Sequence, residues 1–456
     1  MNKIELIPIL IITPFFAPQS HAAMFRVHKL VKYLPEYGYK PIVLTTDINY
    51  LYNNNERLLS ELPECVEIIR TRHIEPSLRG ARMAAGGKDR TFSVMKSSYS
   101  EKKIENRVGE NNNKPNIFKK IPSNLYSYVL NYSKNMPDEY WLWSKLSYSK
   151  ATALIKEHNI KIMYTTANPY SHLGLAIKLK EQLGLKWLAD FRDPCGYGYK
   201  NSVSNYFGHR LEKKLLNQTF AKADKITGLS ETYSSIFSDL YKLNDDFYTF
   251  IPTGSDEAYL PQTKEMISTY SESIVFSGEV MPEQEAYIFE VIQQLHLRDK
   301  SIKMIFIGRS EINKPIIDKL LRTIDNWSID VSYIDHLPQQ ELYNILHSAK
   351  ACILAPGINR YWWTNFAKMV DYIALGVPVI ADVPKLSEAR KELSRAGLGF
   401  FLERDDPVQD ASRLHSWLEN MDRNDPGTDY RNRYLAKSQT RAFASLFDKL
   451  QEETAK

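Results

Sequence analysis

Apolar runs alternate with helical periodicity along the first half of the chain. The run at residues 4–16 predicts a strand, and the apolar spacing that follows predicts a helix built on Met24, Val27, Leu30, Val31 and Leu34. Gly38 is expected to end this helix. Further strands are predicted at 41–46, 160–165, 186–190 and 223–229, with a helix at 171–183. This order indicates a parallel sheet with right-handed crossovers and helices on both faces.

A second series of the same kind begins after residues 251–254. Its predicted strands are 273–278, 302–308, 328–334, 351–355 and 378–381, and its predicted helices are 286–297, 315–324, 339–349 and 364–375. The chain is therefore expected to form two doubly wound α/β domains. Ligands bind at the carboxyl ends of the strands in such sheets, so the site is expected on the loops that follow them.

The N-terminal apolar run imitates a secretory signal followed by a small-residue cleavage site. However, Glu5, Pro8 and Pro14 interrupt the run, and cleavage would remove the first strand of a βαβ unit. No window reaches the 18 or so uninterrupted apolar residues of a spanning helix. We therefore expect a soluble, cytoplasmic protein that could still contact a membrane surface.

The overall composition is that of an ordinary globular protein, and the positions of the charged residues are more informative. The 456 residues are 43% apolar and 25% charged, as in an ordinary globular protein of two or three domains. Cys65, Cys195 and Cys352 are widely spaced, which fits a reducing compartment and argues against a disulfide framework or a zinc site.

The net charge of +5 is concentrated in one stretch, residues 72–134. This stretch has thirteen Lys or Arg against five Asp or Glu, so the rest of the chain is net acidic. The aromatic residues near its end are Tyr126, Tyr128, Tyr132, Tyr140, Trp141 and Trp143. Contact with an anionic leaflet or acceptor and a solvated flexible insertion both fit this pattern. Nucleic-acid binding has no accompanying fold signature.

Familiar catalytic motifs are missing from the sequence. It lacks the Gly-x-Gly-x-x-Gly dinucleotide motif, the P-loop, Gly-x-Ser-x-Gly and His-Glu-x-x-His. What remains is a predicted helix that starts near Thr364, whose free N–H groups and positive dipole end suit a diphosphate. Lys368 lies one turn in, and Asp371 lies a turn further, where it could accept hydrogen bonds from ribose hydroxyls. The alternative is a surface helix with incidental charges.

Residues 368–380 resemble the nucleotide-sugar-binding segment of the family 4 (group 1) glycosyltransferases, which have the GT-B fold. The shared pattern is Lys-x-x-Asp-Tyr-Ile-Ala-x-Gly-x-Pro-Val-Ile. Other segments that resemble the family, in the family's order, are 13–18 with Arg26, 187–194, 223–227 with Ser230 and Glu231, 251–256, 276–278, 306–308 and 337–342. The resemblance covers nearly the whole chain.

The resemblance implies two doubly wound Rossmann-like domains that face a central cleft. The expected acceptor domain is 1–252, with the basic insertion at about 72–134, and the expected nucleotide-sugar domain is 253–432. The helix at 433–456 would return to the first domain. The implied activity is a metal-independent transfer, with retention and without a cofactor, from a UDP-linked sugar to a glycan or lipid-linked glycan in surface polysaccharide synthesis. The enzyme would act at the inner face of the cytoplasmic membrane.

The same resemblance assigns roles to particular residues. The catalytic residues it implies are Asp190, Arg192 and Asp193. The donor-binding residues are Gly278, Gly308, Arg309, Leu337, Thr364, Asn365, Lys368 and Asp371. The acceptor-side residues are Ser20, His21, Arg26 and His172. Two alternatives stay open, because an internal Arg–Asp pair could fix the loop at 190–193, and His172 could be an ordinary residue of a helix start.

Several positions depart from the family pattern. Trp363 stands where the family has its first Glu, and Glu279 and Gln284 stand where many members have Arg and Lys. Lys368 and Arg309 would have to neutralise the diphosphate instead. These departures keep open a non-catalytic GT-B protein that binds a glycan or a partner. A sugar-nucleotide epimerase on the same fold has no supporting acid/base pattern.

Overall fold

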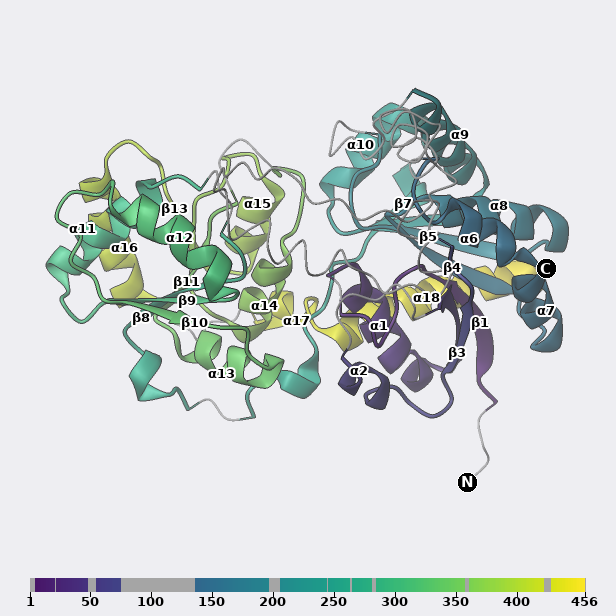
Figure 1. Ribbon diagram of the computed structural model, residues 1–456, viewed down its shortest axis with the longest axis horizontal. Helices are drawn as coiled ribbons and strands as arrows, with labels where there is room; N and C mark the ends of the chain where they lie inside the picture. Colours follow the sequence, from purple (N-terminus) through teal and green to yellow (C-terminus); the bar gives the residue numbers. More distant parts are fainter. Residues whose placement is uncertain are drawn as a thin grey trace, which may run out of the picture. The chain divides into compact units, whose positions relative to one another are not determined.

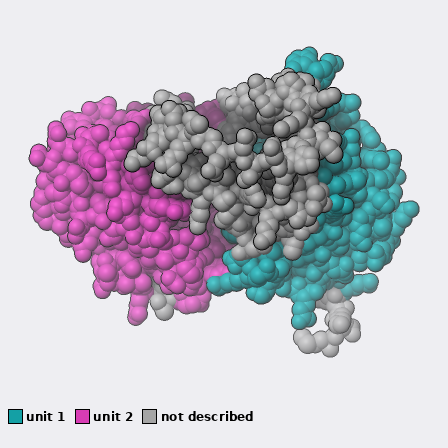
Figure 2. All heavy atoms as spheres, in the orientation of Figure 1, with its two compact units in different colours: residues 1–227, 237–248, 444–456 teal, residues 228–236, 249–443 magenta. Residues whose placement is uncertain are grey.

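The computed structural model forms two compact units, coloured separately in Figure 2. Unit 1 comprises residues 1–227, 237–248 and 444–456, and unit 2 comprises 228–236 and 249–443. The structure describes residues 5–20, 22–47, 55–74, 136–196, 206–243, 245–262, 265–280, 284–356, 361–421 and 428–455. Most of the predicted basic insertion, together with Tyr126, Tyr128 and Tyr132, lies outside the described residues, as does His21.

The first sheet has seven strands in the order β3-β2-β1-β4-β5-β6-β7 (Figure 1). They are β1 (Ile7–Ile12), β2 (Tyr39–Thr46), β3 (Glu67–Thr71), β4 (Ile162–Ala167), β5 (Lys186–Phe191), β6 (Lys225–Gly228) and β7 (Tyr248–Phe250). Strands β1 to β5 pair in parallel. Because β1 lies between β2 and β4, the strand order reverses there, as expected for a doubly wound sheet.

Helices and short turns connect these strands. They are α1 (Ala22–Tyr33), η1 (Leu34–Tyr37), α2 (Arg57–Ser60), α6 (Trp141–Leu146), α7 (Tyr148–Glu157), α8 (Ser171–Leu183), α9 (Tyr206–Lys222), α10 (Thr232–Tyr241) and η3 (Asp245–Phe247). Gly38 ends η1 with a φ of 87°, so the predicted terminator is confirmed and the left-handed conformation explains the glycine. The predicted first strand is shorter than the apolar run, because residues 13–19 form the loop into α1.

The second sheet has six parallel strands in the order β10-β9-β8-β11-β12-β13. They are β8 (Ser273–Ser277), β9 (Lys303–Ile307), β10 (Val331–Ile334), β11 (Ala351–Leu354), β12 (Val379–Ala381) and β13 (Gly399–Phe401). The connecting elements are η4 (Glu257–Tyr259), η5 (Ser268–Tyr270), α11 (Tyr287–Arg298), α12 (Ser310–Leu321), α13 (Gln339–Ser348), α14 (Ala367–Leu375), α15 (Glu388–Arg395), α16 (Pro407–Asn420) and α17 (Thr428–Asn432).

Alternate residues of the unit 2 strands enter different hydrophobic clusters. Val275 and Ile305 pack with α13, α14 and α15, whereas Ile274 and Met304 pack with α11, α12 and α16. Both faces of the sheet are therefore covered, which explains the continuous apolar runs in the sequence. The predicted helix at 315–324 is wrong at its start, because α12 begins at Ser310 and contains Pro315 in its interior.

The last helix, α18 (Ala436–Ala455), begins in unit 2 and ends in unit 1. Within unit 1 the Phe447 ring lies 5.6 Å from the ring of Tyr39 and 6.4 Å from that of Tyr164. The Tyr39 hydroxyl donates a hydrogen bond to Asp448 at 2.7 Å. The final turns of the chain are thus part of the core of the N-terminal sheet.

Candidate functional site

The strongest candidate site lies at the carboxyl ends of β8 and β9 in unit 2. Each strand is followed by a glycine with positive φ, Gly278 at 97° and Gly308 at 154°. The Gly278 N–H donates to the Ile307 carbonyl at 2.8 Å, which joins the two turns. A Cβ on Gly308 would lie 2.6 Å from the Gly278 carbonyl oxygen, so only glycine fits there. Two turns with exposed backbone therefore meet at this edge of the sheet.

Lys368 on α14 reaches this edge. Its Nζ lies 4.0 Å from the centroid of the Phe276 ring, and a Cβ on Gly278 would lie 3.9 Å from the same Nζ. Burial lowers the pKa of Lys368 to about 8. Lys368 forms no ion pair with any described residue. At neutral pH the ammonium is therefore charged, and no carboxylate of the described chain compensates it.

The start of α14 adds further positive potential. Its N-cap residue, Phe366, provides no side-chain hydrogen bond to the first turn. The N–H groups of that turn point toward the N-terminus, where the helix dipole is positive. The preceding Asn365 is only 8% exposed; its Nδ2 donates to the Leu229 carbonyl at 2.7 Å, and its buried Oδ1 accepts no hydrogen bond from any described residue. The first-turn N–H groups of α14 thus remain as donors beside this residue.

Asp371 lies one turn after Lys368 and belongs to an internal polar network. Its Oδ1 accepts hydrogen bonds from the hydroxyls of Ser255 and of Tyr343, the latter at 2.6 Å. Gln339 donates to the Tyr343 hydroxyl at 2.7 Å, and burial raises the pKa of Tyr343 well above its usual value. The sequence missed Ser255 and Tyr343, since they are 116 and 28 residues from Asp371.

The charge of Arg309, unlike that of Lys368, is compensated by a carboxylate. It forms an ion pair with Glu279, and both side chains are about half exposed. The start of α12 already has a carboxylate partner in Asp335. The Ser310 N–H donates to Asp335 at 3.1 Å, and the Ser310 hydroxyl donates to the same oxygen at 2.5 Å. These hydrogen bonds hold the pKa of Asp335 below its usual range. Leu337 packs against the hydrophobic cluster beneath α13 and α14.

Aromatic rings precede α14. The Trp363 ring lies 5.6 Å from the Trp362 ring and 6.2 Å from the Tyr361 ring. Thr364 is within 3.3 Å of the hydroxyl of Tyr233. Partly exposed aromatic faces therefore flank the helix start that carries Lys368.

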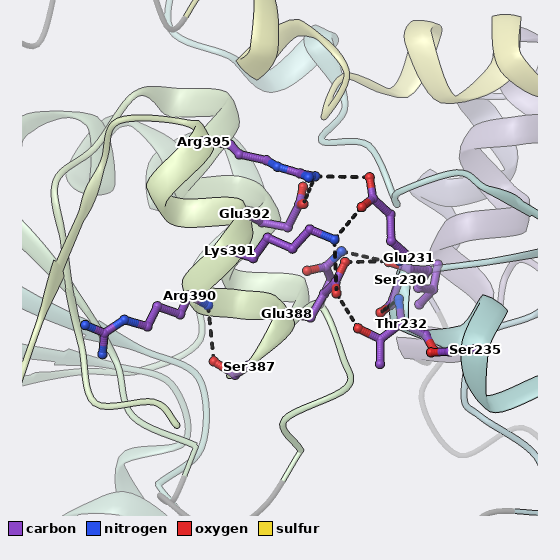
Figure 3. Close-up of polar contacts among 12 residues, drawn as sticks. Ser230, Glu231, Thr232, Ser235, Ser387, Glu388, Arg390, Lys391, Glu392 and Arg395 are labelled. Atoms are coloured by element: carbon purple, nitrogen blue, oxygen red, sulfur yellow. Dashed lines mark hydrogen bonds and ion pairs between the residues drawn. The ribbon is translucent and has the colours of Figure 1, made fainter. Parts of the chain in front are cut away.

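The buried carboxylate of Glu388, on α15, lies at the start of α10, as Figure 3 shows. Glu388 accepts hydrogen bonds from the Glu231 N–H at 3.0 Å and from the Thr232 hydroxyl at 2.5 Å. Glu388 therefore supplies the negative charge at the positive, N-terminal end of the α10 dipole. Although burial alone would raise the pKa of Glu231, hydrogen bonds from Lys391 and Arg395 hold it below its usual value.

In unit 1 the structure brings together two residues that the sequence placed in different groups, Arg26 and Asp190. The Arg26 guanidinium donates to both carboxylate oxygens of Asp190 at 2.8 Å, and the exposed fractions are 2% and 0%. Tyr164 and Thr227 donate to the same carboxylate at 2.9 and 2.7 Å. Burial disfavours ionisation, but Arg26 and these hydroxyls hold the pKa of Asp190 below its usual value. In this conformation the carboxylate is enclosed by protein donors.

The remaining predicted residues of unit 1 lie around this pair. Arg192 follows β5, donates to the Asn168 carbonyl and is partly exposed, as is Asp193. His172 is fully buried, and burial lowers its pKa to about 3, so the ring is neutral at physiological pH. The start of α8 is capped by Asp138, whose Oδ2 accepts from the N–H groups of Tyr170 and Ser171. Ser20 is partly exposed before α1. Sequence reasoning missed Asp138, which lies 32 residues before Tyr170.

Among the described residues no group of three or more His, Cys, Asp or Glu side chains could hold a metal ion.

Solved structures share this architecture. Sucrose-phosphate synthase from Thermosynechococcus elongatus matches with a TM-score of 0.59 and 12% identity, over 98% of this chain and 100% of that chain. HepE from Anabaena in complex with UDP matches with a TM-score of 0.59 and 9% identity, over 97% and 100%. A putative UDP-N-acetylglucosamine 2-epimerase from Listeria monocytogenes matches with a TM-score of 0.55 and 9% identity, over 98% and 97%.

Neither the family models nor the curated proteins compared with the sequence give a match. The fold is GT-B, with two doubly wound Rossmann-like units, as the sequence predicted. At these identities the likeness shows the fold alone. Since an epimerase shares it, the reaction has to be argued from the site.

Proposed function

We propose that this protein is a glycosyltransferase that takes its sugar from a nucleotide-diphosphate donor, held at the start of α14. The observation that carries the proposal is the Lys368 ammonium, which has no carboxylate partner among the described residues and lies beside Gly278 near an uncapped helix start. A diphosphate supplies the missing negative charge, and helix N-termini bind phosphate in this way.

The same groups suit the chemistry of transfer. Breaking the bond between sugar and diphosphate leaves negative charge on the departing phosphate oxygen. Lys368 and the first-turn N–H groups of α14 are already oriented to stabilise that charge, so little reorganisation is needed. Trp363 and Tyr361 offer aromatic faces for a base or sugar ring.

UDP is the nucleotide that we propose, supported by the UDP complex of the structurally similar HepE. We further propose that the acceptor is a glycan or lipid-linked glycan of surface polysaccharide assembly and that it meets unit 1, near Arg192 and Asp193. Transfer would proceed with retention at the anomeric carbon and without a metal ion. Its place would be the inner face of the cytoplasmic membrane.

The proposal is tested by incubating the full chain with a panel of nucleotide sugars and following donor hydrolysis, with calorimetry for binding. We expect a UDP-sugar to bind and to be hydrolysed slowly without acceptor. The rate should be the same with EDTA. If no nucleotide sugar binds or turns over at millimolar concentration, the enzymatic proposal is abandoned.

A second candidate is a non-catalytic GT-B protein that binds a glycan or a partner. Two observations favour it: Glu279 compensates Arg309, and the predicted catalytic Asp190 is enclosed with Arg26. UDP binding without turnover of any nucleotide sugar, combined with glycan binding, would support this candidate over the transferase.

A further inference from the structure

Helix α9 of unit 1 exposes large apolar side chains. Tyr206 is 71% exposed, Phe207 57% and Leu211 37%. Phe207 and Leu211 are four positions apart and lie on one face of the helix, and Tyr206 borders that face. Exposed aromatic and aliphatic side chains grouped in this way mark an interaction surface.

The opposite face of α9 already packs on unit 1. Phe220 stacks on Tyr241 with centroids 3.9 Å apart and lies 5.0 Å from Phe191, and Leu216 is also buried. This packing fixes the rotation of the helix about its axis. The exposed apolar face is therefore directed away from the sheet by the core itself.

Cations share the exposed face. Arg210, Lys213 and Lys214 are all exposed, and their positions fall within the same face as Tyr206 and Leu211. The helix has four Lys or Arg and a single acidic residue, Glu212. Basic side chains interleaved with aromatic and aliphatic ones are typical of helices that lie in the headgroup region of a bilayer.

We propose that the exposed face of α9 docks on an anionic lipid surface. The apolar side chains enter the headgroup region, while Arg210, Lys213 and Lys214 contact lipid phosphates. No described helix is long and apolar enough to cross a membrane. This proposal rests on the proposed function in one respect: docking would give the enzyme access to a lipid-linked acceptor.

The test is sedimentation of the full chain with vesicles of phosphatidylcholine alone or mixed with phosphatidylglycerol. We expect binding to the mixed vesicles that weakens with salt. Tyr206→Ser/Phe207→Ser/Leu211→Ser, which keeps every charge, should weaken the partition coefficient by roughly tenfold or more. Lys213→Glu/Lys214→Glu, which keeps the apolar residues, should weaken it by a similar factor.

Matched controls alter exposed residues of unit 2. Leu297→Ser/Leu386→Ser removes side chains that are 50% and 92% exposed, and Lys300→Glu/Lys303→Glu makes the same charge change elsewhere. Both controls should bind vesicles like the unchanged chain.

Three results would overturn the proposal. In the first, the α9 variants bind vesicles as well as the unchanged chain does. In the second, the unit 2 controls lose as much vesicle binding as the α9 variants. In the third, light scattering shows that the unchanged chain is a dimer and that the triple serine variant is a monomer. The last would assign the face to a second copy. Donor hydrolysis is measured in parallel; a vesicle-binding failure with intact hydrolysis refutes the docking alone.

Discussion

Lys368 combines a partly buried position with a positive charge that a ligand can neutralise. The ammonium lies over the Phe276 ring, and burial lowers its pKa to about 8. A group desolvated in the free protein gains most when a diphosphate replaces the lost hydration. Arg309, by contrast, already has Glu279 as a partner and is half exposed. We therefore expect substitution of Lys368 and of Arg309 to have different effects on UDP binding.

Lys368→Met should weaken UDP binding by roughly 10- to 150-fold, the equivalent of about 1.5–3 kcal/mol for a charge-assisted contact. The melting temperature should change little, since no ion pair within the described residues is lost. Arg309→Met is the matched control and should cost less than about 1 kcal/mol. Isothermal calorimetry measures both, and equal effects of the two substitutions would argue against the site.

Binding of UDP should weaken as pH rises through 8. Lys368 is charged below its pKa, so at pH 9 about one tenth of the free protein carries the ammonium, and the affinity should fall roughly tenfold from its value at pH 7. Calorimetry at the two pH values measures this change. The same titration of Lys368→Met corrects for ionisation of the nucleotide; a persistent fall in that variant would assign the effect to another group.

Arg26 and Asp190 show how burial limits a residue's role. Removing one partner of a buried ion pair leaves the other charge unpaired. Arg26→Met should therefore lower the free energy of unfolding by about 3–5 kcal/mol, measured by urea denaturation. Asp190→Asn should also destabilise the protein, yet the rate per folded molecule should remain within about tenfold. A stable Asp190→Asn protein with no activity would contradict this expectation and support the predicted catalytic role of Asp190.

At the scale of elements, α15 supports the start of α10. Glu388 is 2% exposed and accepts from a backbone N–H and a hydroxyl of the first residues of that segment (Figure 3). It acts as a cap supplied by a helix more than 150 residues away. The same region contributes the Leu229 carbonyl that fixes Asn365 beside α14. This hydrogen bond joins the segment before α10 to the segment before α14.

Glu388→Ala should destabilise the start of α10 by about 1–3 kcal/mol, because it leaves buried donors without an acceptor. Hydrogen exchange of peptides covering 229–236 measures the loss. Glu388→Gln keeps an acceptor oxygen and should retain more than half of the protection. Unchanged exchange in the alanine variant would show that water replaces the carboxylate.

For the whole molecule, α18 is an element whose first residues belong to unit 2 and whose last residues belong to unit 1. Phe447 is fully buried against Tyr39 and Tyr164, whereas Gln439 accepts a hydrogen bond from the Gly254 N–H in unit 2 at 2.8 Å. The C-terminal residues therefore complete the core of the N-terminal sheet. Unit 1 is not a continuous piece of the sequence.

Phe447→Ala should destabilise unit 1 by about 3–5 kcal/mol through the cavity it leaves. Limited proteolysis followed by mass spectrometry should find earlier cleavage within 1–227 than within 249–443. Phe401→Ala, at a partly buried position in unit 2, is the comparison. Equal acceleration in both units would contradict an effect confined to unit 1.

Apolar periodicity and the glycine positions predict the two doubly wound units and their turns, because both are properties of residues that are close together in the chain. It also placed Lys368 near the start of a helix, although α14 begins three residues later than predicted. Which charges are compensated depends on the folded chain. The partners of Arg26, Asp371 and Glu388 are separated from them by 164, 116 and 157 residues in sequence. Such pairings depend on which strands and helices become neighbours, and no local pattern records that.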